Sequence, residues 1–234
     1  MVPHVSKPVR STNLSLPQTG KVLRTALFLL AASLPLAAEW HPTFYEYYPH
    51  HNFTFGAGIA EPKGDLGGYF VNKPGISVGY GYRFLRYLQA DVGLDVVFGA
   101  AHVRDYLNTD FGPLRIRDRQ FFVPFGGRAI LPLFKGRLLI SGGGGGAYLR
   151  YAELLRQPSD YFKIDCPVCL TRDGWGYYAL TDVSAFLDHN QHFRVGVTAK
   201  SYRGHTEGDS LAGVPAIRTK DRWLNILGNV GFSF

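Results

Sequence analysis

The sequence predicts an all-β protein, an eight-stranded antiparallel up-and-down transmembrane β-barrel. Three observations in its 234 residues predict this fold. Eight stretches alternate apolar and polar side chains, the connections between them alternate in length, and the charges inside them lie opposite the apolar side chains. Successive side chains of a strand point to opposite faces, so each stretch has one apolar and one polar face. Strands of about ten residues also match a tilted crossing of the hydrocarbon layer.

The last stretch, 223–234, shows the alternation most clearly. One face carries Phe234, Phe232, Val230, Gly228, Ile226 and Leu224. The other face carries Ser233, Gly231, Asn229, Leu227, Asn225 and Trp223. In an outer-membrane barrel the apolar face contacts lipid and the polar face turns into the lumen.

The other seven strands are predicted from the same pattern. They cover 52–60, 75–84, 88–98, 120–131, 138–151, 175–187 and 192–202. Short connections lie near Leu85, Lys135 and His189, and long ones lie between them. Short periplasmic turns and long outer loops are typical of outer-membrane barrels. The even number of strands allows both termini to lie on one side of the membrane.

Two segments need separate interpretation. Pro124 lies within a predicted strand but has no N–H for a ladder, which predicts a bulge or a local irregularity. The run Gly142–Gly146 invites comparison with a phosphate-binding loop, which would need a helix or a following Lys and Ser/Thr. Instead, Ala147, Tyr148 and Leu149 continue a strand. The run is therefore predicted as barrel wall, where glycine permits sharp coiling and leaves room for bulky lumen side chains.

The charged residues of the strands predict the character of the lumen. They are Arg83, Asp91, Asp95, Arg128, Asp182, Arg194 and Lys200. An unpaired charge facing lipid costs roughly 2–4 kcal/mol at mid-membrane, so the charged face must be the lumen. A soluble lipocalin-like barrel, the main alternative, would turn its apolar face inward. Because eight strands enclose little more than side chains, the predicted lumen is filled by a charge network rather than open.

The N-terminal segment is predicted to be a secretory signal peptide, residues 1–38. Lys21 and Arg24 precede a short apolar run that ends in small residues. That run is shorter than the roughly 20 residues of a spanning helix. Residues 39–51 are predicted as a periplasmic lead-in and 52–234 as the outer-membrane barrel. Without the signal peptide, 25 − 4 = 21 basic and 18 acidic residues remain, so the formal charge falls from +7 to +3. This balance does not favour nucleic acid as a partner.

Cys166 and Cys169 lie in the long connection 152–173. In an exported protein they predict a small disulfide-pinned loop, with a redox motif as the alternative. The lead-in histidines His41, His50 and His51 have no further ligands spaced to complete a metal site. No metal and no cofactor are therefore predicted.

The alternation, the loop asymmetry and the C-terminal Phe234 resemble the small bacterial outer-membrane barrels of the OmpA transmembrane-domain and OmpX type. The resemblance covers about 52–234 and implies a bacterial outer-membrane location, contacts with outer-membrane lipid and lipopolysaccharide, and a monomer. It also implies that the barrel-insertion machinery reads Phe234, Phe232 and Val230 as an assembly signal. The sequence departs from OmpA in having no peptidoglycan-binding domain after the barrel.

Three functions are compatible with this fold. The first is a non-enzymatic structural or surface-interaction barrel with long outer loops, which carry Arg104, Arg115, Arg117, Arg156 and Arg172. The second is a narrow, porin-like channel, suggested by the glycine-rich inner surface. The third, and least favoured, is a lipid A-modifying enzyme. Its candidate residues are His205, Glu207 and Ser210, which the predicted strands place in a loop.

Overall fold

A computed structural model describes residues 48–100, 106–109, 112–156, 170–211 and 214–234. Its elements are β1 (His51–Gly64), the short 3-10 helix η1 (Asp65–Gly68), β2 (Lys73–Leu85), β3 (Leu88–Phe98), β4 (Tyr106–Thr109), β5 (Gly112–Leu133), β6 (Leu138–Arg156), β7 (Leu170–Phe186), β8 (Phe193–Gly208) and β9 (Thr219–Ser233). Within this part of the chain, no helix has the length and hydrophobicity of a membrane span. The predicted signal peptide lies outside the described residues.

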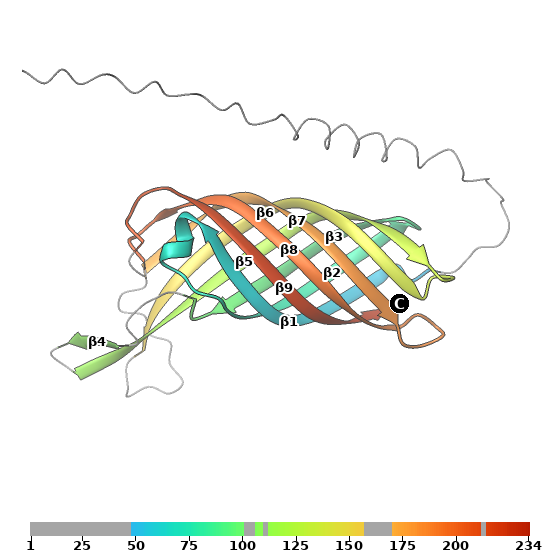
Figure 1. The fold of residues 1–234 in the computed structure, drawn as a ribbon, viewed down its shortest axis with the longest axis horizontal. Helices are drawn as coiled ribbons and strands as arrows, with labels where there is room; N and C mark the ends of the chain where they lie inside the picture. The colour runs from blue at the N-terminus through green and yellow to red at the C-terminus, as the bar shows by residue number, and fades with distance from the viewer. Residues whose placement is uncertain (1–47, 101–105, 110–111, 157–169, 212–213) are drawn as a thin grey trace, which may run out of the picture. The chain divides into compact units, whose positions relative to one another are not determined.

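Eight of the strands form a closed antiparallel ring (Figure 1). β1 pairs with both β2 and β9, which joins the first strand to the last. β3 pairs directly with β5, while the short β4 lies outside the ring and, among the described residues, pairs with β5 alone. The chain is therefore an eight-stranded antiparallel up-and-down barrel, as the alternation predicted.

The pairing registers fix the tilt of the strands. We followed each residue to its paired residue on the next strand, once around the ring. Starting from Phe232 on β9, these steps pass Phe53 on β1 and return to β9 at Arg222. The path therefore shifts by 232 − 222 = 10 residues over one turn. With about 3.3 Å per residue and about 4.8 Å between strands, this stagger gives a tilt of about 40°, typical of small barrels.

Both termini of the barrel and its short connections lie at one end. At the closing seam, the N–H of His51 donates to the carbonyl oxygen of Phe234 at 2.8 Å, and the reverse bond is 3.0 Å. Phe234 also stacks on the ring of His51, with centroids 5.2 Å apart. Short connections mark the periplasmic end of such barrels, so the opposite end is extracellular.

The outer wall is a belt of exposed apolar side chains. Phe55, Ile59, Val183, Val197 and Val230 are between 49% and 60% exposed, whereas polar residues between them are buried. Val96 is an exception to the predicted exposure, since it is only 8% exposed; it lies opposite Ile76 and Phe121 on the flanking strands. A soluble barrel would hide such a belt. Lipid contact explains it.

The strands extend further at the extracellular end than the sequence predicted. β5 begins at Gly112 and β6 ends at Arg156, whereas the predicted strands began at 120 and ended at 151. In this region the inward positions stay buried but the outward ones become polar, as at Arg203 and Arg222. Strands predicted from their apolar outward residues therefore end at the membrane boundary, although the hydrogen-bond ladder continues beyond it.

This extension corrects the predicted arginine-bearing loops. Arg115, Arg117 and Arg156 lie on strands rather than in loops. Arg172 lies on β7 and is completely buried. Arg104 lies outside the described residues.

Pro124 interrupts one ladder without shifting it. Its pairing with β6 is continuous, but the pairs that would join it and Val123 to β3 are missing. The register is the same on both sides of this gap, so the irregularity is local and is not a bulge. The only register shift in the β2–β3 pair lies instead between Arg83 and Leu85.

The five-glycine run lies in the middle of β6, as barrel wall. A Cβ atom on Gly145 would lie 2.2 Å from the carbonyl oxygen of Phe125, and one on Gly144 would lie 2.4 Å from that of Tyr178. Both distances are well inside van der Waals contact. The glycines therefore allow β6 to approach both neighbouring strands closely.

Candidate functional site: the filled lumen

Two ion pairs lie in the lumen. Arg128 on β5 donates from Nε to Oδ2 of Asp91 on the neighbouring β3 at 2.6 Å. Lys200 on β8 reaches across the lumen to Oδ1 of Asp95 on β3, with Nζ and oxygen 2.7 Å apart. β3 and β8 are not neighbours in the ring, so the second pair ties opposite walls together.

Asp95 accepts three hydrogen bonds in the lumen. Besides Lys200, it accepts bonds from the hydroxyl of Tyr202 at 2.8 Å and from Nδ2 of Asn225 at 3.3 Å. Its residue surface is 1% exposed. The Lys200 ammonium also donates to Oγ of Ser77 at 2.9 Å. Three donors satisfy this buried charge, as burial requires.

Asp182 is stabilised by neutral donors rather than by a cation. The hydroxyl of Thr198 donates to it at 2.6 Å, that of Ser184 at 3.1 Å, and Nδ2 of Asn229 at 3.1 Å. No ion pair to Asp182 forms among the described residues.

Arg194 and Arg83 also have no carboxylate partner within the described part of the chain. Arg194 extends over Gly231 to Thr54, with Nη2 2.9 Å from the threonine hydroxyl. Arg83, near the periplasmic end, donates to the backbone carbonyl of Arg86 and lies over the ring of Tyr48. The seven predicted lumen charges are thus all inward, and the structure joins four of them as two ion pairs.

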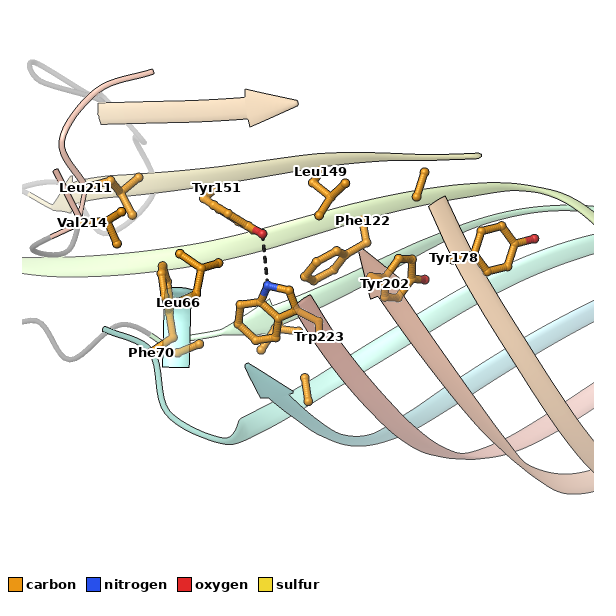
Figure 2. Close-up of a cluster of buried hydrophobic side chains, with 14 of the residues drawn as sticks. Leu66, Phe70, Phe122, Leu149, Tyr151, Tyr178, Tyr202, Leu211, Val214 and Trp223 are labelled. Atoms are coloured by element: carbon orange, nitrogen blue, oxygen red, sulfur yellow. Dashed lines mark hydrogen bonds between the residues drawn. The ribbon is translucent and has the colours of Figure 1, made fainter. Parts of the chain in front are cut away.

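An aromatic plug (Figure 2) fills the lumen. It lies on the extracellular side of the ion pairs, since Trp223 precedes on β9 the residue Asn225 that is paired with Lys200. Its centre is Trp223, whose Nε1 donates to the hydroxyl of Tyr151 at 3.1 Å. The ring of Phe122 stacks on Tyr202 with centroids 4.8 Å apart and meets Trp223 edge-on at 5.4 Å. Phe70, which follows η1, packs against Trp223 at 5.7 Å. We refer to Trp223, Tyr151, Phe122, Tyr202 and Phe70 as the aromatic plug.

A buried arginine closes the space beside the plug. Arg172 donates to the carbonyl oxygens of Pro215 and Ile217, at 3.1 and 2.9 Å, and to Oγ1 of Thr219 at 3.0 Å. These bonds fasten the β8–β9 connection onto the barrel. Arg172 itself was predicted to lie in the connection 152–173, so the strand pattern did not assign it an inward position.

Asp221 and Arg172 share Thr219 as a hydrogen-bond partner and together form a polar layer beside the plug. It accepts bonds from the hydroxyls of Thr219 at 2.7 Å and Tyr151 at 3.1 Å, and from that of Thr206. Burial raises the pKa of Asp221 above its ordinary value, although these bonds and the nearby Arg172 oppose the shift. The plug is therefore covered by a bonded polar layer.

The packed side chains leave a cavity of about 40 Å³ in the lumen. Gln89, Asp91, Arg128, Asp182 and Arg194 are among the residues that line it. A buried water needs roughly 10–15 Å³ by the same kind of measure, so the cavity has room for a few waters. Gln89 also has a buried side-chain oxygen without a partner, which a water could satisfy. The cavity can therefore hold water.

The remaining predicted residues do not gather in a site. His205 and Glu207 lie on β8 rather than in a loop, and both side chains are exposed on the outer face, while Ser210 follows the strand. The described part of the chain contains no cluster of three His, Cys, Asp or Glu residues able to hold a metal. His50 and His51 instead contact the carbonyl oxygen of Arg83 and the hydroxyl of Tyr80. Cys166 and Cys169 lie outside the described residues.

The three residues predicted as an assembly signal lie on the lipid-facing side of the closing seam. Val230, Phe232 and Phe234 are all exposed outward. Val230 and Phe232 are paired between β1 and β8.

Comparison with known proteins finds similar solved structures at low sequence identity. No family model and no curated protein matches the chain. Among solved structures, it is similar to Neisserial surface protein A, at 11% identity and a TM-score of 0.49, over 79% of this chain and 97% of the other. It is also similar to Ail, the attachment invasion locus protein of Yersinia pestis, at 11% identity and a TM-score of 0.47, over 80% and 100%. A third is the outer membrane protein OprG from Pseudomonas aeruginosa, at 14% identity and a TM-score of 0.43, over 80% and 97%.

The closed ring of eight strands, its lipid-facing apolar belt and its polar interior define a class of protein. The chain is a small β-barrel of the bacterial outer membrane.

Proposed function

We propose that this protein is a non-conducting outer-membrane barrel with a structural or surface-interaction role at its extracellular end. The aromatic plug is the observation that carries the proposal. Trp223 is 1% exposed and Phe122 and Tyr151 are fully buried, although all three point into the lumen of a barrel. Packed aromatic rings leave no room for a hydrated ion to pass between them.

The cavity does not favour the alternative of a narrow channel. Its volume of about 40 Å³ fits a few waters, and the ion pair of Lys200 and Asp95 crosses the lumen. An ion would have to separate this pair and then displace the plug. Both steps need side chains to leave well-bonded positions.

Planar bilayer recordings test this proposal. The natural chain is expected to give no steady conductance, while Trp223→Ala should give measurable conductance because it removes the centre of the plug. Phe55→Ala is the matched control, since it removes an aromatic ring that is 54% exposed toward lipid. Heat-modifiable gel migration establishes that each variant is folded. A steady open pore in the natural chain would contradict the proposal.

The extracellular strand extensions support a surface role. β4 and the first residues of β5 form a hairpin outside the ring, which adds backbone beyond the membrane-spanning wall (Figure 1). Backbone of this kind serves well for contacts with lipopolysaccharide or host surfaces. Deleting 100–112 should then reduce surface binding of cells while leaving barrel folding intact, as measured by cell adhesion and gel migration.

We also propose that the barrel does not modify lipid. His205 and Glu207 face outward from β8, opposite Trp175 and Asp173 rather than a serine nucleophile. Lipid A mass spectra should be unchanged when the protein is expressed. A new lipid A species that disappears in His205→Ala would contradict this.

A further inference from the structure

Three cations stand side by side on the outer wall. Lys63 on β1 lies opposite Arg222 on β9, and Arg222 lies opposite Arg203 on β8. All three side chains are exposed outward. Their strands β1, β9 and β8 are neighbours in the barrel (Figure 1). Like charges directly opposed across a ladder destabilise it. We call these residues the cation row.

The cation row has little negative charge of its own. Lys63 contacts Glu61 at 3.2 Å, and both side chains are about half exposed. Arg203 and Arg222 form no ion pair among the described residues. An external anion would therefore relieve the repulsion that the fold builds into this surface.

The height of the row on the barrel indicates where that anion lies. The outward apolar run of β9 extends from Phe234 to Leu224, and Arg222 is the next outward position. Ten residues at about 3.4 Å each, tilted by about 40°, span about 26 Å. This matches the roughly 25 Å apolar band of outer-membrane barrels. The cation row therefore begins where the hydrocarbon layer ends, on its extracellular side.

Neighbouring aromatic residues mark the same boundary. Tyr177 on β7 lies opposite Arg203, and Trp175 lies opposite His205. Both aromatic side chains are exposed, at 57% and 64%. Girdles of such residues lie at the membrane interface. At this height and on this side, a wall residue meets the headgroups of outer-leaflet lipid.

We propose that Lys63, Arg203 and Arg222 bind the phosphate groups of a phosphorylated outer-leaflet glycolipid. Strands about 4.8 Å apart place neighbouring cations within reach of one phosphate. Guanidinium groups bind phosphate oxygens through paired, charge-assisted hydrogen bonds. The proposal depends on the orientation of the barrel in the membrane and not on whether its lumen conducts. The phosphate-binding proposal and the proposed non-conducting function can therefore fail separately.

The test uses the full chain refolded in phosphatidylcholine vesicles. Bisphosphorylated lipid A is added in steps, and the urea midpoint of unfolding is followed. We expect lipid A to raise the midpoint of the natural chain. The triple variant Lys63→Gln, Arg203→Gln, Arg222→Gln should weaken apparent affinity about a hundredfold, since each cation near a charged membrane surface contributes about a factor of five.

Two controls keep the test specific. The variant Arg86→Gln, Lys135→Gln, Arg137→Gln removes the same charge from exposed residues at the opposite, periplasmic rim, and should keep the natural response. Dephosphorylated lipid A should not raise the midpoint. The proposal is overturned if the wall variant responds like the natural chain, if dephosphorylated lipid acts equally well, or if free inorganic phosphate reproduces the shift.

Discussion

We predict that substituting Asp95 lowers the free energy of unfolding more than substituting any other polar residue of the barrel, including its partner Lys200. Asp95→Asn keeps the shape of the side chain and one acceptor oxygen, but it leaves the Lys200 ammonium in the lumen, beside the hydroxyl of Ser77, without its counter-charge. Leaving a buried charge without its counter-charge costs about 3–5 kcal/mol. Lys200→Met has a smaller effect, because Asp95 keeps Tyr202 and Asn225 as donors. Losing one bond to a charged group costs about 2 kcal/mol.

The double variant separates this reasoning from a simple loss of packing. With both charges removed, no buried charge is left uncompensated, so the double variant should cost less than the sum of the two single variants. The expected difference is about 0.5–3 kcal/mol, the range for residues in direct contact. The measurement is reversible urea unfolding in lipid vesicles, followed by tryptophan fluorescence.

Glu61→Gln supplies the control for the same change in charge. Its ion pair with Lys63 is about half exposed, so the loss should be below about 1 kcal/mol. Additive costs for Asp95→Asn and Lys200→Met would refute a direct pair across the lumen. So would a larger loss for Lys200→Met than for Asp95→Asn.

Three further predictions concern other parts of the barrel. Gly231→Ala should cost about 1–3 kcal/mol in urea unfolding, because its Cβ would lie 2.5 Å from Nε of Arg194; Gly228→Ala, whose nearest atom is 3.8 Å away, should be nearly neutral. The raised pKa of Asp221 makes folding less stable as pH rises from about 3.9, the ordinary aspartate pKa, through the raised value. Asp221→Asn should remove this decrease in a pH series of unfolding midpoints, and an unchanged pH dependence would contradict it. Deleting Phe234 should reduce the amount of barrel in outer-membrane fractions, whereas equal amounts would argue against its role as an assembly signal.

The membrane-spanning part of the fold was predictable because lipid imposes a strict rule on it. Each outward residue must be apolar, so residues such as Phe55 and Val197 reveal both the strands and their facing. The even strand count makes the first and last strands antiparallel, as their pairing in the closed ring requires. The same rule placed Asp95 and Lys200 in the lumen. Their pairing was not predictable, since it depends on the stagger between β3 and β8 across the barrel.

The extracellular half was less predictable because the rule no longer applies there. Outward residues such as Arg203 and His205 are polar, so the alternation loses its apolar half although the ladder continues. Arg172 was assigned to a loop for this reason, and its inward bonds could not be inferred. One signal was available: Thr219, Asp221 and Trp223 continue the inward positions of the last strand in steps of two.

The position of the aromatic plug follows from this change of environment. Inside the membrane, the lumen is lined by bonded charges such as Arg128 and Asp91, which water in the cavity can also solvate. Above Leu224 the outer face becomes polar, and the apolar residues that stabilise folding must lie inside. The barrel thus inverts its two faces at the membrane boundary. In the membrane-spanning part the outer face is apolar and the lumen is polar. In the extracellular part the outer face carries the cation row, and Trp223 lies inside. The cation row and the plug therefore mark the same boundary from opposite sides of the wall.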